Sequence, residues 1–126
     1  MNKKKIITFD LETIADKSVI SLLPPIEADS RLKDPAKIEA NIKEKEDKRI
    51  EKLGLEPTTA RICCFGWYEH QEKTASYIML EEETPEAEKK LLQQVWIILA
   101  EGDHFVTFNG IGFDVPMLLM RSLITV

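Results

Sequence analysis

The sequence predicts an α/β fold, a mixed sheet flanked by helices. Three observations favour this class. Short apolar runs rich in β-branched and aromatic residues alternate with amphipathic segments, two of those segments begin with a capping residue followed by Pro, and the 126 residues match the length of one domain. The predicted order is strand, long helical insertion, hairpin, helix, strand and helix, packed around a single core.

Four stretches predict the strands of this sheet. The first, "KKIITFD", contains Ile6, Ile7 and Phe9, a run that favours a strand with both faces covered. "RICCFGWYEH" and "TASYIML" are rich in aromatic and β-branched residues and are separated by the polar "QEK", which predicts a hairpin. "HFVTFNG" predicts another short buried strand.

Three helices are predicted, at about 35–54, 85–102 and 114–123. The first lies in an insertion at about 14–60, where Asp34 caps a helix that begins with Pro. Gly54 ends it, and we expect a left-handed backbone there. Its interleaved charges indicate a solvated face rather than a binding patch. Thr84 caps the second helix, whose apolar residues recur at helical spacing and face the core.

Composition restricts the compartment and the partners. Lys and Arg number 17 against 22 Asp and Glu, a net charge of −5, so no overall positive field attracts nucleic acid. The apolar runs are too short to cross a bilayer and no secretory leader is recognisable, so we expect a cytoplasmic protein without membrane contact. Cys63 and Cys64 are adjacent, which suits reduced packing residues. Trp67, Trp96 and the methionines are expected in the core.

The stretch "ITFDLET" places two acids, Asp10 and Glu12, on the first strand. Alternating side chains put both carboxylates on one side of the strand, where like charges destabilise the fold unless a cation compensates. Oxygen-only ligands favour Mg²⁺ or Mn²⁺. In the alternative reading the strand ends at Asp10 and both acids lie in water.

A second stretch, "FNGIGFDVPML", follows the last predicted strand and places Asp114 at the start of a helix. In the alternative reading, Asn109 and Gly110 form an ordinary turn and Asp114 is an N-cap. The glycines do not match a nucleotide-binding loop, because Val115 stands where G-x-G-x-x-G counted from Gly110 requires Gly.

Together, "FDLET" and the N-x-x-x-F-D-x-P-x-L pattern resemble the first two motifs of the DEDD 3′-to-5′ exonucleases, in the form closest to the exonucleases related to family-B DNA polymerases. The resemblance implies an RNase H-like fold and hydrolysis of phosphodiester bonds at the 3′ end of single-stranded DNA, with RNA also possible. It implies two ions, Mg²⁺ or Mn²⁺. Asp10 would bridge both ions, Glu12 would bind the water-activating ion and Asp114 would hold the second.

The resemblance also implies contacts with the substrate and with other proteins. Leu11 and Thr13 would contact the terminal nucleotide, while Asn109 and Phe113 would position the strand. A polymerase or another replication or repair protein is the partner class that it suggests. The inserted segment receives no role from it.

One feature of the motif pattern is missing. The family needs a fourth acid and a Tyr or His that activates water, and "VPMLLMRSLITV" after Asp114 contains neither. We therefore expect the 126 residues to be the N-terminal part of one exonuclease domain, incomplete at its C-terminal side, weakly active or inactive alone, and self-associating through uncovered apolar surface. The alternative is a catalytically inactive nucleic-acid-binding or interaction module on the same fold.

Overall fold

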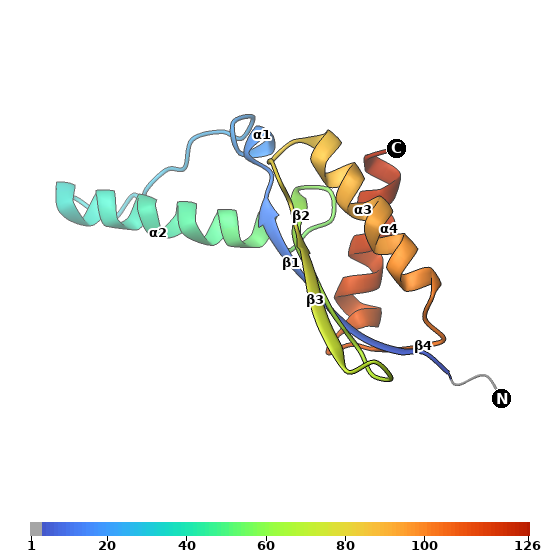
Figure 1. The fold of residues 1–126 in the computed structure, drawn as a ribbon. Coiled ribbons are helices and arrows are strands. Elements are labelled where there is room, and N and C mark those ends of the chain that lie inside the picture. The colour runs from blue at the N-terminus through green and yellow to red at the C-terminus, as the bar shows by residue number, and fades with distance from the viewer. Residues whose placement is uncertain (1–3) are drawn as a thin grey trace.

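The structure is a computed structural model that describes residues 4–126, and within them it contains one four-stranded mixed sheet (Figure 1). The strand order is β3-β2-β1-β4, with β1 antiparallel to β2, β2 antiparallel to β3, and β1 parallel to β4. The strands are β1 (Ile6–Ala15), β2 (Ala60–Glu69), β3 (Thr74–Met79) and β4 (His104–Val106). The predicted α/β class with a mixed sheet flanked by helices is confirmed.

The helices are α1 (Lys17–Ile20), α2 (Pro35–Leu53), α3 (Pro85–Ala100) and α4 (Val115–Ile124), and a π-helical turn, η1 (Gly110–Asp114), leads directly into α4. The predicted caps are present, because the side chains of Asp34 and Thr84 accept hydrogen bonds from the first turns of α2 and α3. The sequence analysis missed α1, a single turn capped by Asp16. None of the helices in residues 4–126 combines the length and the apolar character needed to span a membrane.

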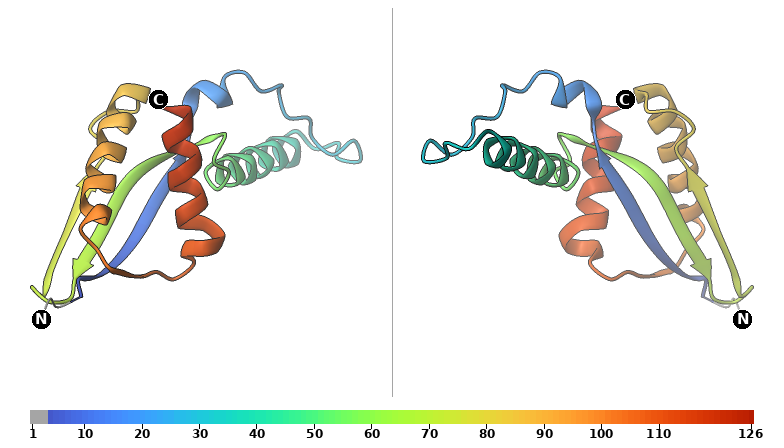
Figure 2. Two further views of the ribbon diagram at one scale, coloured as in Figure 1. Left: turned by 90° about the vertical axis from the view of Figure 1, so that its right-hand side faces the viewer. Right: turned by 90° about the vertical axis from the view of Figure 1, so that its left-hand side faces the viewer.

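Helices α3 and α4 cover one face of the sheet and leave the other face open (Figure 2). Ile7, Phe9 and Leu11 of β1 point toward the helices, where the buried core also includes Ala60, Ile62, Phe65, Leu91, Leu92, Val95, Met117 and Leu118. The prediction that both faces of the first strand are covered is wrong, because Asp10 and Glu12 in the middle of the strand are exposed on the face opposite α3 and α4, and α2 contacts only the end of the strand. The alternate residues of β1 therefore reach solvent.

A bulge changes the alternation of β2 in the middle of the sheet. The pairing with β1 shifts between Glu12 and Thr13, so that Ile62 and Phe65 both face the core although three positions separate them. The thiol of Cys63, inside the bulge, donates a hydrogen bond to the carbonyl oxygen of Glu12 at 3.3 Å. Both cysteines are free, as expected.

Helix α2 extends away from the sheet, and its base is attached to β1 (Figure 1). None of its residues is buried, in agreement with the solvated face that its charges indicate. The expected left-handed backbone at Gly54 is wrong, because φ is −69°. A Cβ atom there would stand 3.4 Å from the backbone nitrogen of Ala15, an ordinary van der Waals contact, so crowding does not require glycine at this position either.

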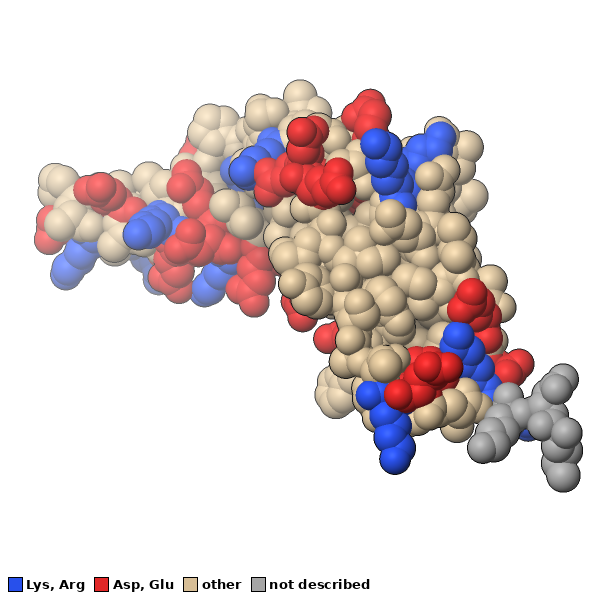
Figure 3. Space-filling view, in the orientation of Figure 1, with Lys and Arg blue, Asp and Glu red and all other residues tan. Residues whose placement is uncertain are grey.

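Several residues expected in the core are exposed. Trp96 is 38% exposed, Met79 and Met120 also reach solvent, and every residue of β4 is exposed, because β4 is an edge strand of the described sheet. Met117 and Trp67 do belong to or pack against the core, whereas Met1 lies outside the described residues. Figure 3 shows a broad uncharged surface over α3 and β3 and mixed charges along α2. The expected self-association stays a prediction.

Candidate active site at the open edge of the central strand

Asp10 and Glu12 lie in the middle of β1 and are exposed on the open face of the sheet. The strand continues to Ala15, so the alternative in which it ends at Asp10 is wrong. Their neighbours Phe9 and Leu11 are buried on the opposite face, as alternation requires. The structure therefore places both carboxylates side by side on a rigid strand, with their side chains free of the core.

The neighbouring strand leaves space beside these acids. Gly66 of β2 pairs with Asp10, and Tyr77 of β3 pairs in turn with Gly66. A Cβ atom on Gly66 would meet only the Ser76 carbonyl oxygen, at 4.0 Å, so the position is open. Tyr77 is 67% exposed. On the open face, Gly66 therefore lies between the carboxylate of Asp10 and the ring of Tyr77. Asp10 and Tyr77 are two strands apart, and neighbouring strands are spaced by about 4.7–4.9 Å.

The edge of β1 facing β4 is unpaired beyond Thr8. The parallel pairing ends at Thr8 opposite Val106. The backbone nitrogen of His104 donates to the Lys5 carbonyl oxygen at 3.2 Å, which shows that residue 5 turns its backbone groups toward β4. Backbone groups alternate between the two edges of a strand, so the N–H of Leu11 points to the same side. At this level β4 has already ended, and the edge is available to another group.

Asp114 lies at this edge, because the backbone N–H of Leu11 acts on its carboxylate. In η1 the backbone nitrogens of Phe113 and Asp114 both donate to the Asn109 carbonyl oxygen, at 2.8 and 3.4 Å. The extra residue of such a π-type turn changes the direction of the side chain that follows, and turns of this kind are frequent at functional sites. The alternative reading of Asp114 as an N-cap is wrong, because its backbone is helical and its carboxylate caps nothing.

The carboxylate of Asp114 is buried and incompletely paired. The residue is 4% exposed, and its Oδ2 atom has no hydrogen-bond partner. Burial raises the pKa of Asp114 above its ordinary value, and the negative charges of Asp10 and Glu12 raise it further. The backbone N–H groups of Asp114 and Leu11 lower the pKa in part. The charges of Asp10 and Glu12 therefore act on Asp114, although more than 100 residues separate the first two acids from the third.

The donor set suits a hard divalent cation. All three side chains offer carboxylate oxygens, and one buried oxygen lacks a partner. Among residues 4–126, however, no three His, Cys, Asp or Glu side chains stand close enough together to hold a metal ion. The structure thus contains carboxylate oxygens that suit such a cation, and their charges interact, but the three side chains are not close enough together to bind one ion.

The four residues predicted to contact substrate lie around the same edge in different environments. Leu11 is buried in the core and only its backbone faces Asp114, while the hydroxyl of Thr13 donates to the Gly54 carbonyl oxygen. Asn109 is exposed, and a Cβ atom at residue 112 would clash with its amide, so the glycine there accommodates the side chain. Phe113 packs against the core. Their contacts with a substrate stay predictions.

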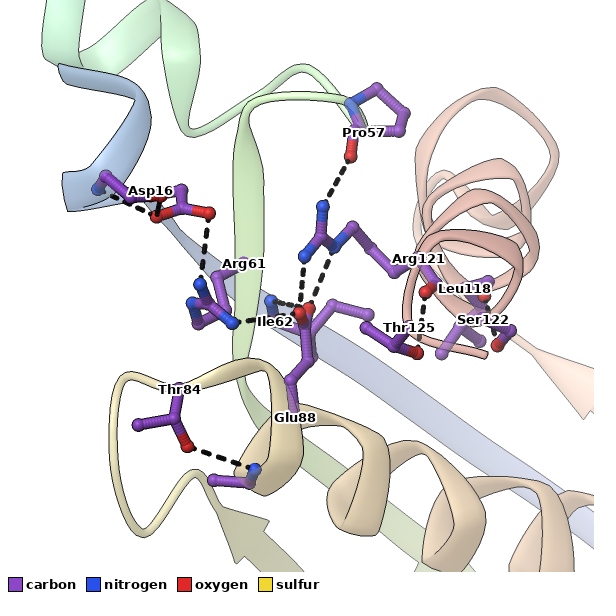
Figure 4. A network of polar contacts seen from close by, with 12 residues as sticks. Asp16, Pro57, Arg61, Ile62, Thr84, Glu88, Leu118, Arg121, Ser122 and Thr125 are labelled. Carbon is purple, nitrogen blue, oxygen red and sulfur yellow. Dashed lines mark hydrogen bonds and ion pairs between the residues drawn. The ribbon is translucent and has the colours of Figure 1, made fainter. Parts of the chain in front are cut away.

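A buried ion network behind this edge was missed by the sequence analysis (Figure 4). Glu88 of α3 is fully buried and accepts hydrogen bonds from Arg121 of α4 and from the backbone nitrogen of Ile62. Arg61 of β2 lies 3.4 Å from Glu88 and 3.0 Å from Asp16. A signal was available, because Glu88 stands at i−3 and i−4 from Leu91 and Leu92, on the apolar stripe of its helix.

Comparison with known proteins agrees with this architecture. The model of the RNase H superfamily matches residues 49–124, more than half of the chain. The chain therefore belongs to the RNase H superfamily. The matched range includes β2, β3, α3, β4 and Asp114, and it begins after the strand that carries Asp10 and Glu12. No curated protein and no solved structure matches.

Membership defines the class of chemistry. Domains of this superfamily are generally nucleic-acid hydrolases that use divalent metals, so the family indicates a nuclease. Asp10 and Glu12 of β1 and Asp114 at the start of α4 are the candidate carboxylates for such chemistry.

Proposed function

We propose that this protein is a metal-dependent 3′-to-5′ exonuclease that acts on single-stranded DNA, related to the exonucleases of family-B polymerases. The observation that carries the proposal is the state of Asp114. Its carboxylate is buried, caps no helix, lacks a partner at Oδ2 and feels the charges of Asp10 and Glu12. Burying a carboxylate in this way is costly, and a bound cation is the simplest compensation.

Asp10, Glu12 and Asp114 would hold the metal ions. When bound, divalent ions supply Lewis-acid activation of water and stabilisation of the leaving oxygen in phosphodiester hydrolysis. The protein contributes a rigid strand for two of the ligands and a buried, low-dielectric position for the third. The predicted ion identities, Mg²⁺ or Mn²⁺, follow from the oxygen-only donor set.

The open face of the sheet would receive the nucleic acid strand. Gly66 leaves the space beside Asp10 free of side-chain atoms, and Tyr77 offers an exposed ring on the far side of that space. Nucleobases stack on such rings without sequence preference, at about 1–3 kcal/mol per base. The protein as a whole carries a charge of −5, so attraction of phosphate would depend on the bound metal.

A second candidate is a nucleic-acid-binding module without activity. One observation favours it: no three His, Cys, Asp or Glu side chains of residues 4–126 stand close enough together to hold a metal ion. Such a module would bind nucleic acid on the open face of the sheet without hydrolysing it.

The two candidates are separated by a single assay. The protein is incubated with a 5′-labelled single-stranded DNA, or with RNA of the same sequence, and Mg²⁺ or Mn²⁺, while anisotropy of a fluorescent strand reports binding. The exonuclease shortens the strand progressively from its 3′ end, Asp10→Asn abolishes this, and Asp47→Asn on the exposed surface of α2 has no effect. Binding without shortening in every protein supports the inactive module. Equal cutting by the parent and by Asp10→Asn rejects the proposed site.

A further inference from the structure

The hydrophobic pattern of α4 does not by itself fix which side of this helix faces the sheet. The buried side carries Met117, Leu118 and Arg121. The residues that reach solvent are apolar as well: Val115, Leu119, Met120, Leu123 and Ile124. An amphipathic helix buries its apolar face, and by that rule the single charged residue of α4, Arg121, would turn toward solvent. Its burial indicates that another interaction helps to select the rotation of the helix about its own axis.

Arg121 supplies that interaction. It is the only charged residue of α4, and it is buried. Its Nε atom donates to Oε2 of Glu88 at 2.9 Å, its Nη2 atom donates to Oε1 of the same carboxylate, and its Nη1 atom donates to the Pro57 carbonyl oxygen at 3.1 Å (Figure 4). A planar guanidinium fork paired to both carboxylate oxygens restricts direction as well as distance.

The acceptor of this fork is itself fixed. Glu88 has no exposed surface, and its Oε2 also accepts from the backbone nitrogen of Ile62 in β2, at 2.9 Å. It therefore connects α4 to both α3 and the sheet. The network is balanced, since Arg61 and Arg121 face Glu88 and Asp16. Buried ion pairs often add little stability compared with apolar packing, and orientation is a role that they can fulfil instead.

Arg121 and Asp114 lie on the same side of α4. They are seven residues apart, which is about two helical turns, so any rotation of the helix moves both side chains together. A rotation by one residue position, about 100°, would carry Asp114 away from the edge of β1. The same face contains Met117 and Leu118 between them, both fully packed into the core.

We propose that Arg121 is a positioning residue, whose fork to Glu88 selects the rotation of α4 that holds Asp114 against the open edge of β1. The consequence for metal binding depends on the proposed function, whereas the geometric claim concerns the metal-free protein. Arg121 touches no reacting group. It acts through the helix that carries Asp114.

The test compares two substitutions in the same network. Arg121→Met removes the fork, while Arg61→Met removes the other buried guanidinium and leaves the pairing of Arg121 with Glu88 intact. Both variants lose a buried ion pair, so both should be destabilised in urea unfolding. Amide hydrogen exchange of the metal-free proteins, at a temperature where both are folded, then reports how firmly α4 is held against the sheet.

We expect residues 115–124 and the amide of Leu11 to exchange at least about tenfold faster in Arg121→Met, with Phe65 of the core protected as in the parent. Arg61→Met should retain the parent pattern in α4. Arg121→Lys keeps the charge but loses the fork, so it should fold and should still show faster exchange in the same segment. Equal loosening of α4 by Arg61→Met and Arg121→Met, or no loosening by either Arg121 variant, would overturn the inference.

Calorimetric titration with Mn²⁺ separates this inference from the proposed function. If both hold, the parent and Arg61→Met bind Mn²⁺ with similar affinity, and Arg121→Met binds it at least about tenfold more weakly. If the exchange pattern is as expected but the parent binds no Mn²⁺, the positioning of Asp114 stands and the metal site is rejected.

Discussion

Replacing Asp114 with Asn is expected to stabilise the metal-free protein at neutral pH, although the substitution removes an acid from the proposed active site. The carboxylate is buried, its Oδ2 atom has no partner, and burial together with the charges of Asp10 and Glu12 raises its pKa. Asn has nearly the same shape and no charge. It therefore removes the repulsion and the cost of burying the ionised form.

The expected gain in stability depends on how much of the cost of burying this side chain the substitution removes. A buried polar atom without a partner costs about 1–3 kcal/mol. Asn still buries a polar amide at this position, so only the charged part of the cost is recovered, and about 1 kcal/mol is the expected gain. For a domain of this length that gain corresponds to an increase of about 3–5 °C in Tm.

The pH dependence gives the sharper test. An acid with a raised pKa in the folded state binds more protons when folded, so its ionisation lowers stability as pH rises through the folded pKa. Below the ordinary value of 3.8, Asp114 is protonated in both the folded and unfolded states, and the parent should match Asp114→Asn. The difference in Tm should open above that pH and level off once the folded carboxyl is ionised.

The assay is thermal unfolding followed by circular dichroism from pH 3 to 8 in the presence of a chelator. Asp47→Asn serves as the matched control, since this acid is exposed on α2 and its replacement should change Tm little at any pH. A lower Tm for Asp114→Asn at pH 7, or a difference from the parent that is constant over the whole range, would refute the argument.

Three further changes test other parts of the site. Glu88→Gln should lower the free energy of unfolding by about 3–5 kcal/mol in urea titrations, because it breaks a buried ion pair from one side, and a loss below 1 kcal/mol would contradict the network. Gly66→Val should fold normally, since a Cβ atom there meets open space, but it should reduce nuclease activity and strand affinity by crowding Asp10; unchanged affinity would place the strand elsewhere. Gly110→Ala should cost about 1–3 kcal/mol, because its Cβ atom would overlap the Thr107 hydroxyl that accepts the hydrogen bond of residue 110, and Gly66→Ala is the harmless comparison.

Local sequence signals were sufficient for most of the elements. Asp34 and Thr84, each followed by Pro, marked the starts of α2 and α3, and aromatic and β-branched runs marked the hairpin of β2 and β3. These signals act within a few residues, so they can be recognised in the sequence without knowledge of the tertiary structure. The conformation of Gly54 was predicted wrongly because a glycine at the end of a helical pattern permits a left-handed backbone but does not require one, and φ is −69° there.

The wrong predictions concern burial, that is, which residues are covered by neighbouring helices and strands. The strand β4 and Trp96 look like core residues in the sequence, yet both are exposed, because burial depends on which other elements pack on them. The open face of β1 was missed for the same reason. Alternation along the strand predicted correctly that Asp10 and Glu12 share a side, but it contains no information on whether that side is covered.

At Asp114 the sequence signal and the tertiary structure lead to different explanations of the same residue. An Asp before Val-Pro at a helix start is ordinarily explained by capping, and this explanation fails only because η1 continues the helical backbone through Asp114. Once capping is removed, only the backbone N–H groups of Asp114 and Leu11 favour the ionised carboxylate: it is buried, its Oδ2 atom is unpaired, and the charges of Asp10 and Glu12 raise its pKa. The buried fork of Arg121 and Glu88 meanwhile fixes the helix that keeps it there. A divalent cation at the open edge of β1, as the proposed function places it, would compensate this buried charge, and that compensation is the physical argument for the proposal.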